Sequence, residues 1–161
     1  MNNLAPTLAA LAQTLTQRGW MLCTAESCTG GLIAAACTER AGSSAWFERG
    51  FVTYSNAAKT ELLGVPAQSI AQHGAVSAEV AQAMARGALA QSAAQCALAV
   101  TGIAGPDGGS PAKPVGTVWL AWAGPFGVHT EVQRFAGDRA AVRAATVRHA
   151  LQKLLLLAQS A

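Results

Sequence analysis

Ser44 and Lys59 are two residues of this sequence whose side chains could act together as a nucleophile and its base. Lysine is rare here, since the 161 residues include only Lys59, Lys113 and Lys153. Burial in a shielded pocket lowers the pKa of a lysine, so its neutral amine can take the proton of a serine hydroxyl without any histidine. Fifteen positions separate Ser44 from Lys59, a separation that folding could close. In the alternative interpretation, Ser44 caps a turn and Lys59 is a solvated helix residue.

A second candidate segment has the sequence ESCTGG, from Glu26 to Gly31, and lies between a predicted strand and a predicted helix. Ligands of open α/β sheets bind beyond the carboxyl ends of the strands, and the free amides at a helix N-terminus attract anions. The segment supplies two hydroxyls that can donate to a phosphate or carboxylate and two glycines that permit close backbone approach: Ser27, Thr29, Gly30 and Gly31. An N-cap followed by a tight turn is the alternative interpretation.

A third candidate segment, rich in glycine and proline, runs from Thr101 to Val115 after another predicted strand. Thr101 stands at the strand end, where a side chain can point into an active-site crevice. Glycines such as Gly102 and Gly105 would let backbone N–H groups line an anion or an aromatic ring. The segment could also be a plain connector.

Cysteine and histidine do not occur in a pattern that is typical of a metal site. The four cysteines form no CxxC pair and have no histidines nearby, and the three histidines are scattered. We therefore expect no bound metal, and hydrolysis would have to proceed without one. Cys28 could itself be a nucleophile, but without a histidine nearby we expect an inert buried thiol.

The segments that carry these residues are connected by alternating helices and strands. Short apolar runs and apolar periodicity predict strands at residues 20–24, 48–54 and 96–100, helices at residues 30–40 and 56–63, a helix with a stripe of small residues from 80 to 88, and a hairpin at residues 116–123 and 128–135. Leucines at positions 4, 8, 11 and 15 predict a first helix, and Ser77 and Asp138 are suitable N-caps for later ones. This order predicts a three-layer α/β/α sandwich with a mixed β-sheet, in a single domain over residues 1–161.

Composition narrows the class of protein. With 52% hydrophobic and 12% charged residues, disorder is not expected, and the low charge suggests a surface partly covered by another subunit, in a homodimer or higher homo-oligomer. The longest strongly apolar run, residues 154–158, is too short to cross a membrane, and nothing at the N-terminus marks secretion. We therefore expect a cytoplasmic protein with no membrane partner.

Four basic residues share the predicted C-terminal helix: Arg139, Arg143, Arg148 and Lys153. A solvated helix face explains them, and an anion-binding role for one or two is the alternative. Because aromatic residues are not interleaved with them, we expect no nucleic-acid partner.

Five stretches, in order between Thr24 and Arg143, resemble the CinA C-terminal domain family in its stand-alone amidase form. They read TAESCTGGLIA, GSSAWFERGFVTYSNAAKTELLGV, HGAVSAEVAQAMARGAL, AVTGIAGPDGGSPAKPVGTVWLA and GDRAAVR. The resemblance implies hydrolysis of the carboxamide of nicotinamide mononucleotide to nicotinate mononucleotide and ammonia, in pyridine-nucleotide salvage and without a metal or other cofactor.

The resemblance also implies roles for residues at the matching positions. The catalytic set would be Ser44 as nucleophile, Lys59 as its base, and Tyr54 and Thr101 in support. Ser27 and the glycine pair beside it would help form the pocket. Arg139, or alternatively Arg143, would hold the substrate phosphate bidentately.

Two alternative functions are open. The chain could be a non-catalytic nucleotide-binding or competence-linked interaction module, since related domains occur fused to another domain. It could also be an amidase whose nucleophile is Cys28, assisted by Glu26 and Lys59. Intact candidate catalytic residues favour the enzyme over the interaction module.

Overall fold

A five-stranded mixed sheet forms the centre of the computed structural model, which describes residues 3–161. The strands are β1 (Leu22–Glu26), β2 (Phe47–Val52), β3 (Cys96–Gly102), β4 (Thr117–Gly124) and β5 (Gly127–Arg134). Their order is β2-β1-β3-β4-β5, in which β2, β1 and β3 are parallel and β4 and β5 form the predicted antiparallel hairpin. The residues that follow β1, β2 and β3 therefore meet at one edge of the sheet.

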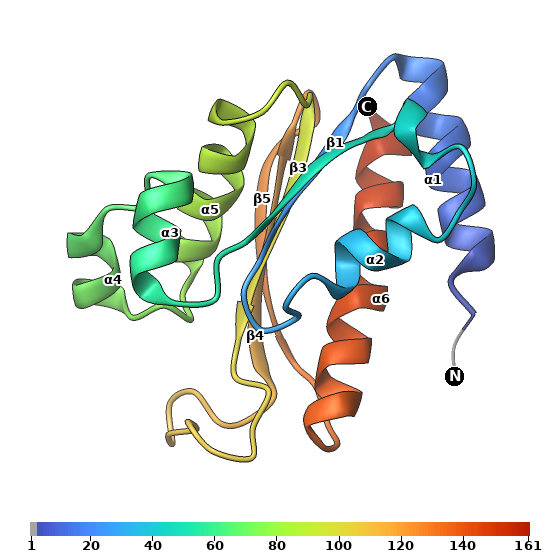
Figure 1. Cartoon of the computed structure of the whole chain (residues 1–161). Coiled ribbons are helices and arrows are strands. Elements are labelled where there is room, and N and C mark those ends of the chain that lie inside the picture. The colour runs from blue at the N-terminus through green and yellow to red at the C-terminus, as the bar shows by residue number, and fades with distance from the viewer. Residues whose placement is uncertain (1–2) are drawn as a thin grey trace.

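Helices cover both faces of this sheet. They are α1 (Ala5–Arg18), α2 (Leu32–Thr38), α3 (Asn56–Leu63), α4 (Ala67–His73), α5 (Ala78–Ala90) and α6 (Arg139–Ser160), with a short 3₁₀ helix η1 (Ser43–Ala45). In Figure 1, α1, α2 and α6 lie on one side of the sheet and α3, α4 and α5 on the other. The predicted α/β/α sandwich with a mixed sheet is confirmed. None of the helices in residues 3–161 has the length and apolar character needed to span a membrane.

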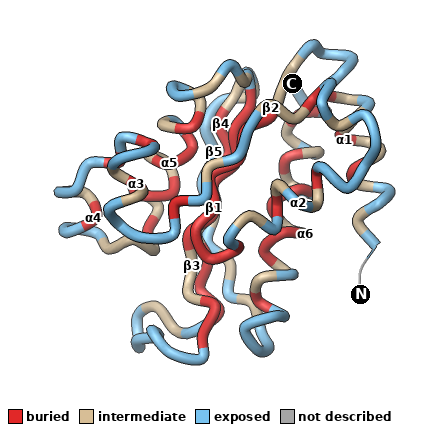
Figure 2. The backbone as a smooth tube through the Cα atoms, in the orientation of Figure 1, coloured by how far each residue is buried: buried red, intermediate tan, exposed pale blue. Residues whose placement is uncertain are grey.

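The central strands and the faces of the helices that pack on them form the core. β1 is buried along its whole length and β3 in all but its last residue, as the red tube at the centre of Figure 2 shows. The small residues of α5 also belong to this core, because a Cβ at Gly87 would meet the Leu63 carbonyl oxygen at 1.9 Å. The predicted stripe of small residues is therefore internal and permits α5 to approach α3 closely.

Several element boundaries differ from the prediction by one or two residues, and one helix was not predicted. β1 ends at Glu26, two residues later than predicted, and α2 begins at Leu32 instead of residue 30. Gly30 and Gly31 have φ angles of +57° and +105°, a left-handed backbone that is incompatible with a right-handed helix. The short helix α4 was not predicted: Pro66, taken as the end of one helix, is the N-cap of the next.

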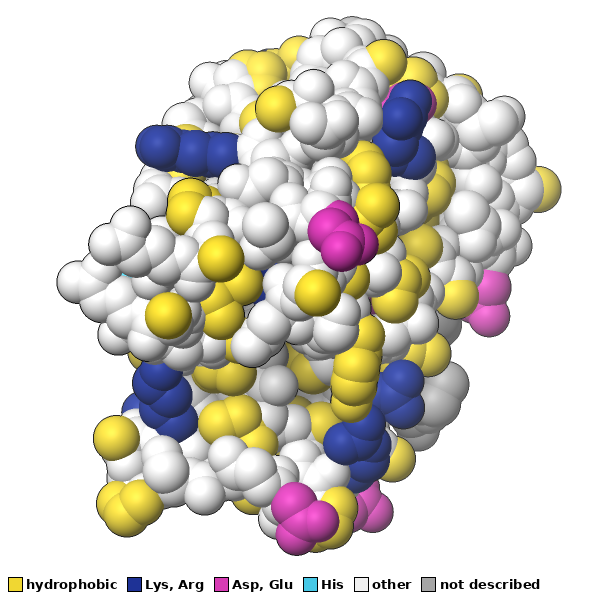
Figure 3. Space-filling model, turned by 60° about the vertical axis from the view of Figure 1, so that its left-hand side comes forward, with side chains coloured by type: hydrophobic (Ala, Val, Ile, Leu, Met, Phe, Trp, Pro, Cys, Tyr) yellow, Lys and Arg dark blue, Asp and Glu magenta, His cyan; other side chains and the backbone are white. Residues whose placement is uncertain are grey.

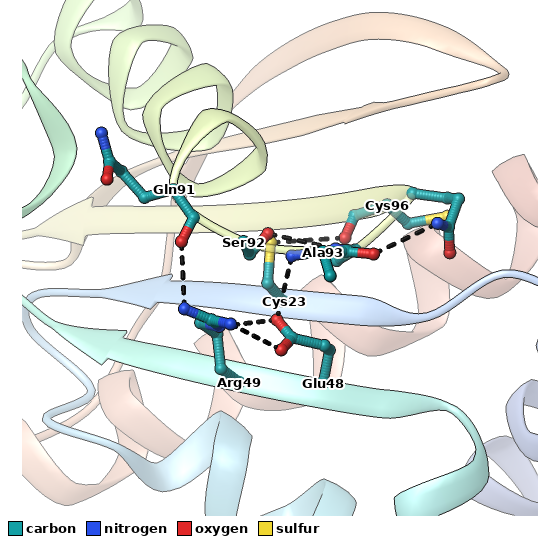
Figure 4. Close-up of polar contacts among 9 residues, drawn as sticks. Cys23, Glu48, Arg49, Gln91, Ser92, Ala93 and Cys96 are labelled. Carbon is teal, nitrogen blue, oxygen red and sulfur yellow. Dashed lines mark hydrogen bonds and ion pairs between the residues drawn. The ribbon is translucent and has the colours of Figure 1, made fainter.

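Polar contacts at the amino-terminal end of the parallel strands fasten β2 to the turn before β3 (Figure 4). Arg49 forms an ion pair with Glu48 at 2.7 Å and donates to the Gln91 carbonyl oxygen at 3.1 Å. The Glu48 carboxylate also accepts from the Ala93 amide at 3.4 Å. We call these four residues the amino-end cluster. Burial raises the pKa of the neighbouring Cys23 thiol to about 11, which keeps it protonated.

Candidate active site

A cavity of about 220 Å³ opens at the edge of the sheet where β1, β2 and β3 end. Residues from several segments line it: Ser27, Cys28, Tyr54, Asn56, Lys59, Ala75, Val76, Thr101, Gly102, Ala104 and Arg139. Six of them are predicted site residues: Ser27, Tyr54, Lys59, Thr101, Gly102 and Arg139. Of the remaining five, Cys28 was considered as an alternative nucleophile and the other four were not predicted as site residues. Ala75 and Val76 belong to a turn that the sequence marks by Gly74 before it and by the N-cap Ser77 after it.

Lys59 is the buried basic residue of this cavity. Its side chain is 1% exposed, and Nζ lies 3.1 Å from Ser27 Oγ. The same nitrogen contacts three consecutive backbone carbonyl oxygens, of residues 53–55, at 3.1, 3.0 and 3.4 Å. Within residues 3–161, Lys59 forms no ion pair with a carboxylate. Burial lowers the pKa of Lys59, opposed in part by the Cys28 thiol, so the neutral amine is accessible as a base.

The start of α3 explains why Lys59 reaches this position. Ser55 is the N-cap, and its hydroxyl oxygen accepts from the Ala58 amide at 3.0 Å. Lys59 follows in the first turn of the helix, where its amide donates to the Ser55 carbonyl oxygen. Side chains on a helix lean toward its N-terminus. The lysine therefore extends back over the end of β2, toward the loop that follows β1.

Ser27 begins that loop, directly after β1. Its hydroxyl, besides contacting Lys59, donates to the Tyr54 carbonyl oxygen at 3.4 Å. Its backbone amide donates to the Val100 carbonyl oxygen of β3 at 3.1 Å, which continues the hydrogen bonding of the sheet by one residue. This amide is therefore not free to stabilise an oxyanion, although the nucleophile's own amide does so in some hydrolases.

Ser44 lies at the other end of the sheet. It is exposed and belongs to η1, just before β2, whereas Lys59 comes after that strand. The neighbouring Trp46 carbonyl oxygen accepts from the amide of Leu22, where β1 begins. The six residues of β2 span roughly 20 Å at about 3.3 Å per residue. The structure therefore corrects the predicted Ser44–Lys59 pair: the serine beside Lys59 is Ser27.

Thr101 and Tyr54 both line the cavity but differ in exposure. Thr101 is buried and donates its hydroxyl proton to the Ala75 carbonyl oxygen at 3.0 Å, so it fixes the turn after α4. Tyr54 is 60% exposed at the rim, and its hydroxyl accepts from Arg139 Nη2 at 3.3 Å. Behind the cavity, a Cβ at Gly102 would lie 2.6 Å from a methyl group of Val118, so a side chain at residue 102 would collide with β4.

Four of the predicted substrate-binding residues do not line the cavity: Thr29, Gly30, Gly31 and Gly105. Thr29 is buried and donates its hydroxyl proton to Glu26 at 2.6 Å. The glycine pair turns the chain into α2 through its left-handed φ angles. Gly105 has a φ of +83°, and its carbonyl oxygen accepts from the arginine of the cavity at 2.9 Å. These residues shape the loops that carry the lining.

A second cavity, of about 680 Å³, adjoins the first and shares Ala104 and Arg139 with it. It lies between the loop after β3 and the start of α6, and its other lining residues are Pro106, Val115, Gly137, Asp138, Ala140 and Arg143. On the face of the molecule that Figure 3 shows, basic side chains lie on both sides of a hollow in the lower part. The Arg143 guanidinium donates to the carbonyl oxygens of Cys28 and Thr29 at 3.1 and 3.3 Å. Arg139 is thus the arginine that borders both cavities.

Cys28 lines the first cavity as a protonated thiol. Burial raises its pKa to about 11, so little thiolate is present near neutral pH. This disfavours Cys28 as the nucleophile. Within residues 3–161, no group of three or more His, Cys, Asp or Glu side chains is arranged to hold a metal ion.

The fold and the site together define an α/β/α protein with a serine–lysine pair at the carboxyl edge of its parallel strands. The chain belongs to the CinA C-terminal domain family, whose family model matches residues 5–158.

Named relatives and a solved structure agree with this membership. Nicotinamide-nucleotide amidohydrolase PncC of Pseudomonas putida is 60% identical over 147 residues, which cover 91% of this chain and 92% of that protein. The protein of the same name from Escherichia coli K12 is 55% identical over 145 residues, covering 89% of this chain and 88% of the relative. The crystal structure of the competence/damage inducible protein CihA from Agrobacterium tumefaciens is 49% identical, with a TM-score of 0.94, and the match covers 98% of this chain and 96% of that one.

Proposed function

We propose that this chain hydrolyses the carboxamide of nicotinamide mononucleotide to give nicotinate mononucleotide and ammonia, with Ser27 as nucleophile and Lys59 as base. The observation that carries the mechanism is the 3.1 Å contact between Ser27 Oγ and a buried Lys59 amine at the edge of a cavity. The substrate is supported by relatives 55–60% identical over most of the chain that are named nicotinamide-nucleotide amidohydrolase.

The first half of the reaction forms an acyl-enzyme. Neutral Lys59 accepts the hydroxyl proton of Ser27 as Oγ attacks the carboxamide carbon, and the carbonyl oxygen becomes an oxyanion. The tetrahedral intermediate then collapses: the C–N bond breaks, the proton on Lys59 passes to the departing nitrogen, and ammonia leaves. In the second half, Lys59 takes a proton from water as the water attacks the ester carbon, and then returns it to Ser27 Oγ.

The surroundings of Lys59 suit both of its protonation states. Burial lowers its pKa and so favours the neutral amine before reaction. The carbonyl oxygens of residues 53–55 point at Nζ and stabilise the ammonium that forms during each half-reaction. The cationic pyridinium of the bound substrate further disfavours the charged amine at the start of the cycle.

The nucleotide part of the substrate fits the arrangement of the two cavities. The smaller one, beside Ser27, would take the carboxamide, and the larger one would take the ribose and phosphate. Arg139 borders both and is the proposed phosphate ligand, because a guanidinium binds phosphate bidentately. Tyr54, at the rim and hydrogen-bonded to Arg139, would cover the pyridinium ring.

Ammonia release from nicotinamide mononucleotide by wild type, Ser27→Ala, Cys28→Ala and Ser44→Ala tests the proposal. We expect Ser27→Ala to be inactive and the other two variants to release ammonia. Activity in Ser27→Ala with loss in Cys28→Ala would assign the cysteine instead, and no release by wild type would refute the substrate. Cytoplasmic location, homo-oligomer formation, a place in pyridine-nucleotide salvage and catalysis without a cofactor stay predictions.

A further inference from the structure

We propose that Glu26 is a positioning residue that holds the Ser27 hydroxyl at Lys59, an inference that rests on the proposed role of Ser27. Glu26 is the last residue of β1, directly before Ser27, and its side chain is 1% exposed. Within the described residues it forms no ion pair. Removing a carboxylate from water without a cationic partner is unfavourable unless hydrogen bonds replace the lost hydration. The role of Glu26 therefore lies in the hydrogen bonds that it makes.

Within residues 3–161, three hydrogen bonds reach the Glu26 carboxylate, one from the Ser27 loop itself and two from the first turn of α2. Oε1 accepts from Thr29 Oγ1 at 2.6 Å and from the Ile33 amide at 2.9 Å, and Oε2 accepts from the Ala34 amide at 3.0 Å. The two amides belong to the first turn of α2 and have no partner within that helix. Gly31, the N-cap of α2, has no side chain to satisfy them. Glu26 therefore caps α2 from across the loop.

The backbone of Glu26 is also fixed. Its carbonyl oxygen accepts from the Thr53 amide at 2.8 Å, and in the sheet it lies between its partners Val52 and Val100. The Glu26 side chain thus sets the separation between the end of β1 and the start of α2. The loop that contains Ser27 connects these two elements. Arg143 also holds this loop, because its guanidinium donates to the carbonyl oxygens of Cys28 and Thr29.

The proposed reaction depends on this separation. Proton transfer requires Ser27 Oγ to stay within hydrogen-bonding distance of Lys59 Nζ, and a displacement of about 1 Å can reduce the rate by roughly 100-fold. Burial sets the downward direction of the Lys59 pKa shift, Cys28 opposes it, and none of the hydrogen bonds to Lys59 Nζ involves Glu26. Loss of the carboxylate is therefore expected to disturb geometry and to leave the protonation of the base unchanged.

The Glu26→Gln variant tests the proposal in the full-length chain. The amide replaces one acceptor by an NH₂ group, which must face the Ile33 amide in one orientation and the Ala34 amide in the other, so donor meets donor. We expect kcat for nicotinamide mononucleotide to fall by about 10- to 100-fold, with KM and the pH dependence of kcat/KM unchanged. Glu48→Gln, in the amino-end cluster, is the matched control: its carboxylate also accepts from a backbone amide, and kcat is expected to stay at the wild-type value.

A second pair of variants addresses the same contact without touching the glutamate. Thr29→Val keeps the shape of the side chain and removes the 2.6 Å hydrogen bond, so kcat is expected to fall as in Glu26→Gln. Thr29→Ser retains the hydroxyl, so its kcat is expected to stay at the wild-type value. Circular dichroism spectra and melting curves identify any variant that fails to fold. Wild-type kcat in both Glu26→Gln and Thr29→Val would overturn the proposal.

Labelling by a fluorophosphonate separates this inference from the choice of substrate. Ser27 Oγ attacks phosphorus, the P–F bond breaks, fluoride leaves and Lys59 takes the hydroxyl proton; peptide mapping then locates the adduct. We expect Glu26→Gln and Thr29→Val to slow labelling of Ser27, and Thr29→Ser to leave it unchanged. If wild type is labelled but releases no ammonia, the proposed substrate is wrong and the labelling rates alone decide the role of Glu26. Equal labelling rates in wild type, Glu26→Gln and Thr29→Val would refute the positioning role of Glu26.

Discussion

The two ends of the parallel strands each carry a basic side chain, and the two side chains differ in burial and in hydrogen-bond partners. At the amino end, Arg49 is exposed and paired with the Glu48 carboxylate. At the carboxyl end, Lys59 is buried, and its hydrogen-bond partners among residues 3–161 are one hydroxyl and three backbone carbonyl oxygens. The exposed ion pair lies between consecutive residues of β2, costs little in desolvation, and its hydrogen bonds reach the turn before β3. A buried amine without a counterion, in contrast, makes protonation unfavourable. The difference indicates that the first contact serves the fold and the second serves chemistry.

Replacement of each basic residue by methionine should give the largest contrast. In Lys59→Met, kcat/KM for nicotinamide mononucleotide is expected to fall by about 10³-fold, the usual contribution of a general base. Arg49→Met removes a cation of similar length and is expected to leave kcat/KM unchanged. Ammonia release measures both. An equal loss in the two variants would mean that the effect of Lys59→Met arises from general destabilisation.

The acid limb of the pH–rate profile should follow Lys59. Its pKa is lowered by burial, so the neutral amine, and with it kcat/KM, should appear at pH values below the ordinary lysine pKa of about 10.4. As pH falls through this lowered pKa, the amine is protonated and kcat/KM decreases. The profile is measured for wild type and for Arg49→Met, which should coincide. If kcat/KM did not change with pH at any pH below the ordinary lysine pKa, Lys59 would be excluded as the base.

Arg139→Ala is expected to act mainly on substrate binding. Loss of a charge-assisted bidentate contact should raise KM about 10- to 100-fold, with kcat much less affected. Nicotinamide riboside, which lacks the phosphate, provides the control, because Arg139→Ala should not weaken its use further. If the variant affected both compounds equally, Arg139 would act on the ring or through Tyr54 rather than on the phosphate.

At the amino end, the predicted effect is a small change in stability that depends on pH. Hydrogen bonds from Arg49 lower the pKa of Glu48. The pair therefore stabilises the fold at pH values above the ordinary carboxyl range, and this contribution is lost as pH falls through the lowered pKa. Melting temperatures of wild type and Glu48→Gln should differ slightly at neutral pH and converge in acid. A difference that persists or grows in acid would contradict this assignment.

Ser44→Ala should have the smallest effect, since Ser44 is exposed and lies beyond the opposite end of β2 from Lys59. We expect unchanged kcat and KM. A large loss of activity would instead place Ser44 in a catalytic site, which could then be completed only by a second copy of the chain.

The layered fold was predictable because its signals are local. Apolar runs mark the buried strands, and caps such as Ser77 and Asp138 mark helix starts, as the structure confirms. The helix α4 was missed because its seven residues are too few for a clear period and follow a proline. Its position nevertheless matters, since the turn after it forms part of the cavity wall.

The site was only partly predictable, because pairing depends on which edge of the sheet a residue occupies. Ser44 and Ser27 are both serines next to strands, and spacing along the chain does not distinguish them. Strand direction does: Ser27 follows β1, as Lys59 follows β2, while Ser44 precedes β2. The rule that ligands bind at carboxyl ends was sufficient to choose Ser27. The contacts of Glu26 and Arg143 depend on side-chain directions in the folded chain, which no sequence pattern here indicates.

The cavity is assembled from distant parts of the chain, with Ser27 after β1, Thr101 in β3 and Arg139 at the start of α6. A partly folded molecule, with α6 still undocked, would therefore lack a complete site even if its central strands were already paired. In a refolding experiment, ammonia release should recover only after the slow non-local contacts have formed, later than the helical signal in circular dichroism.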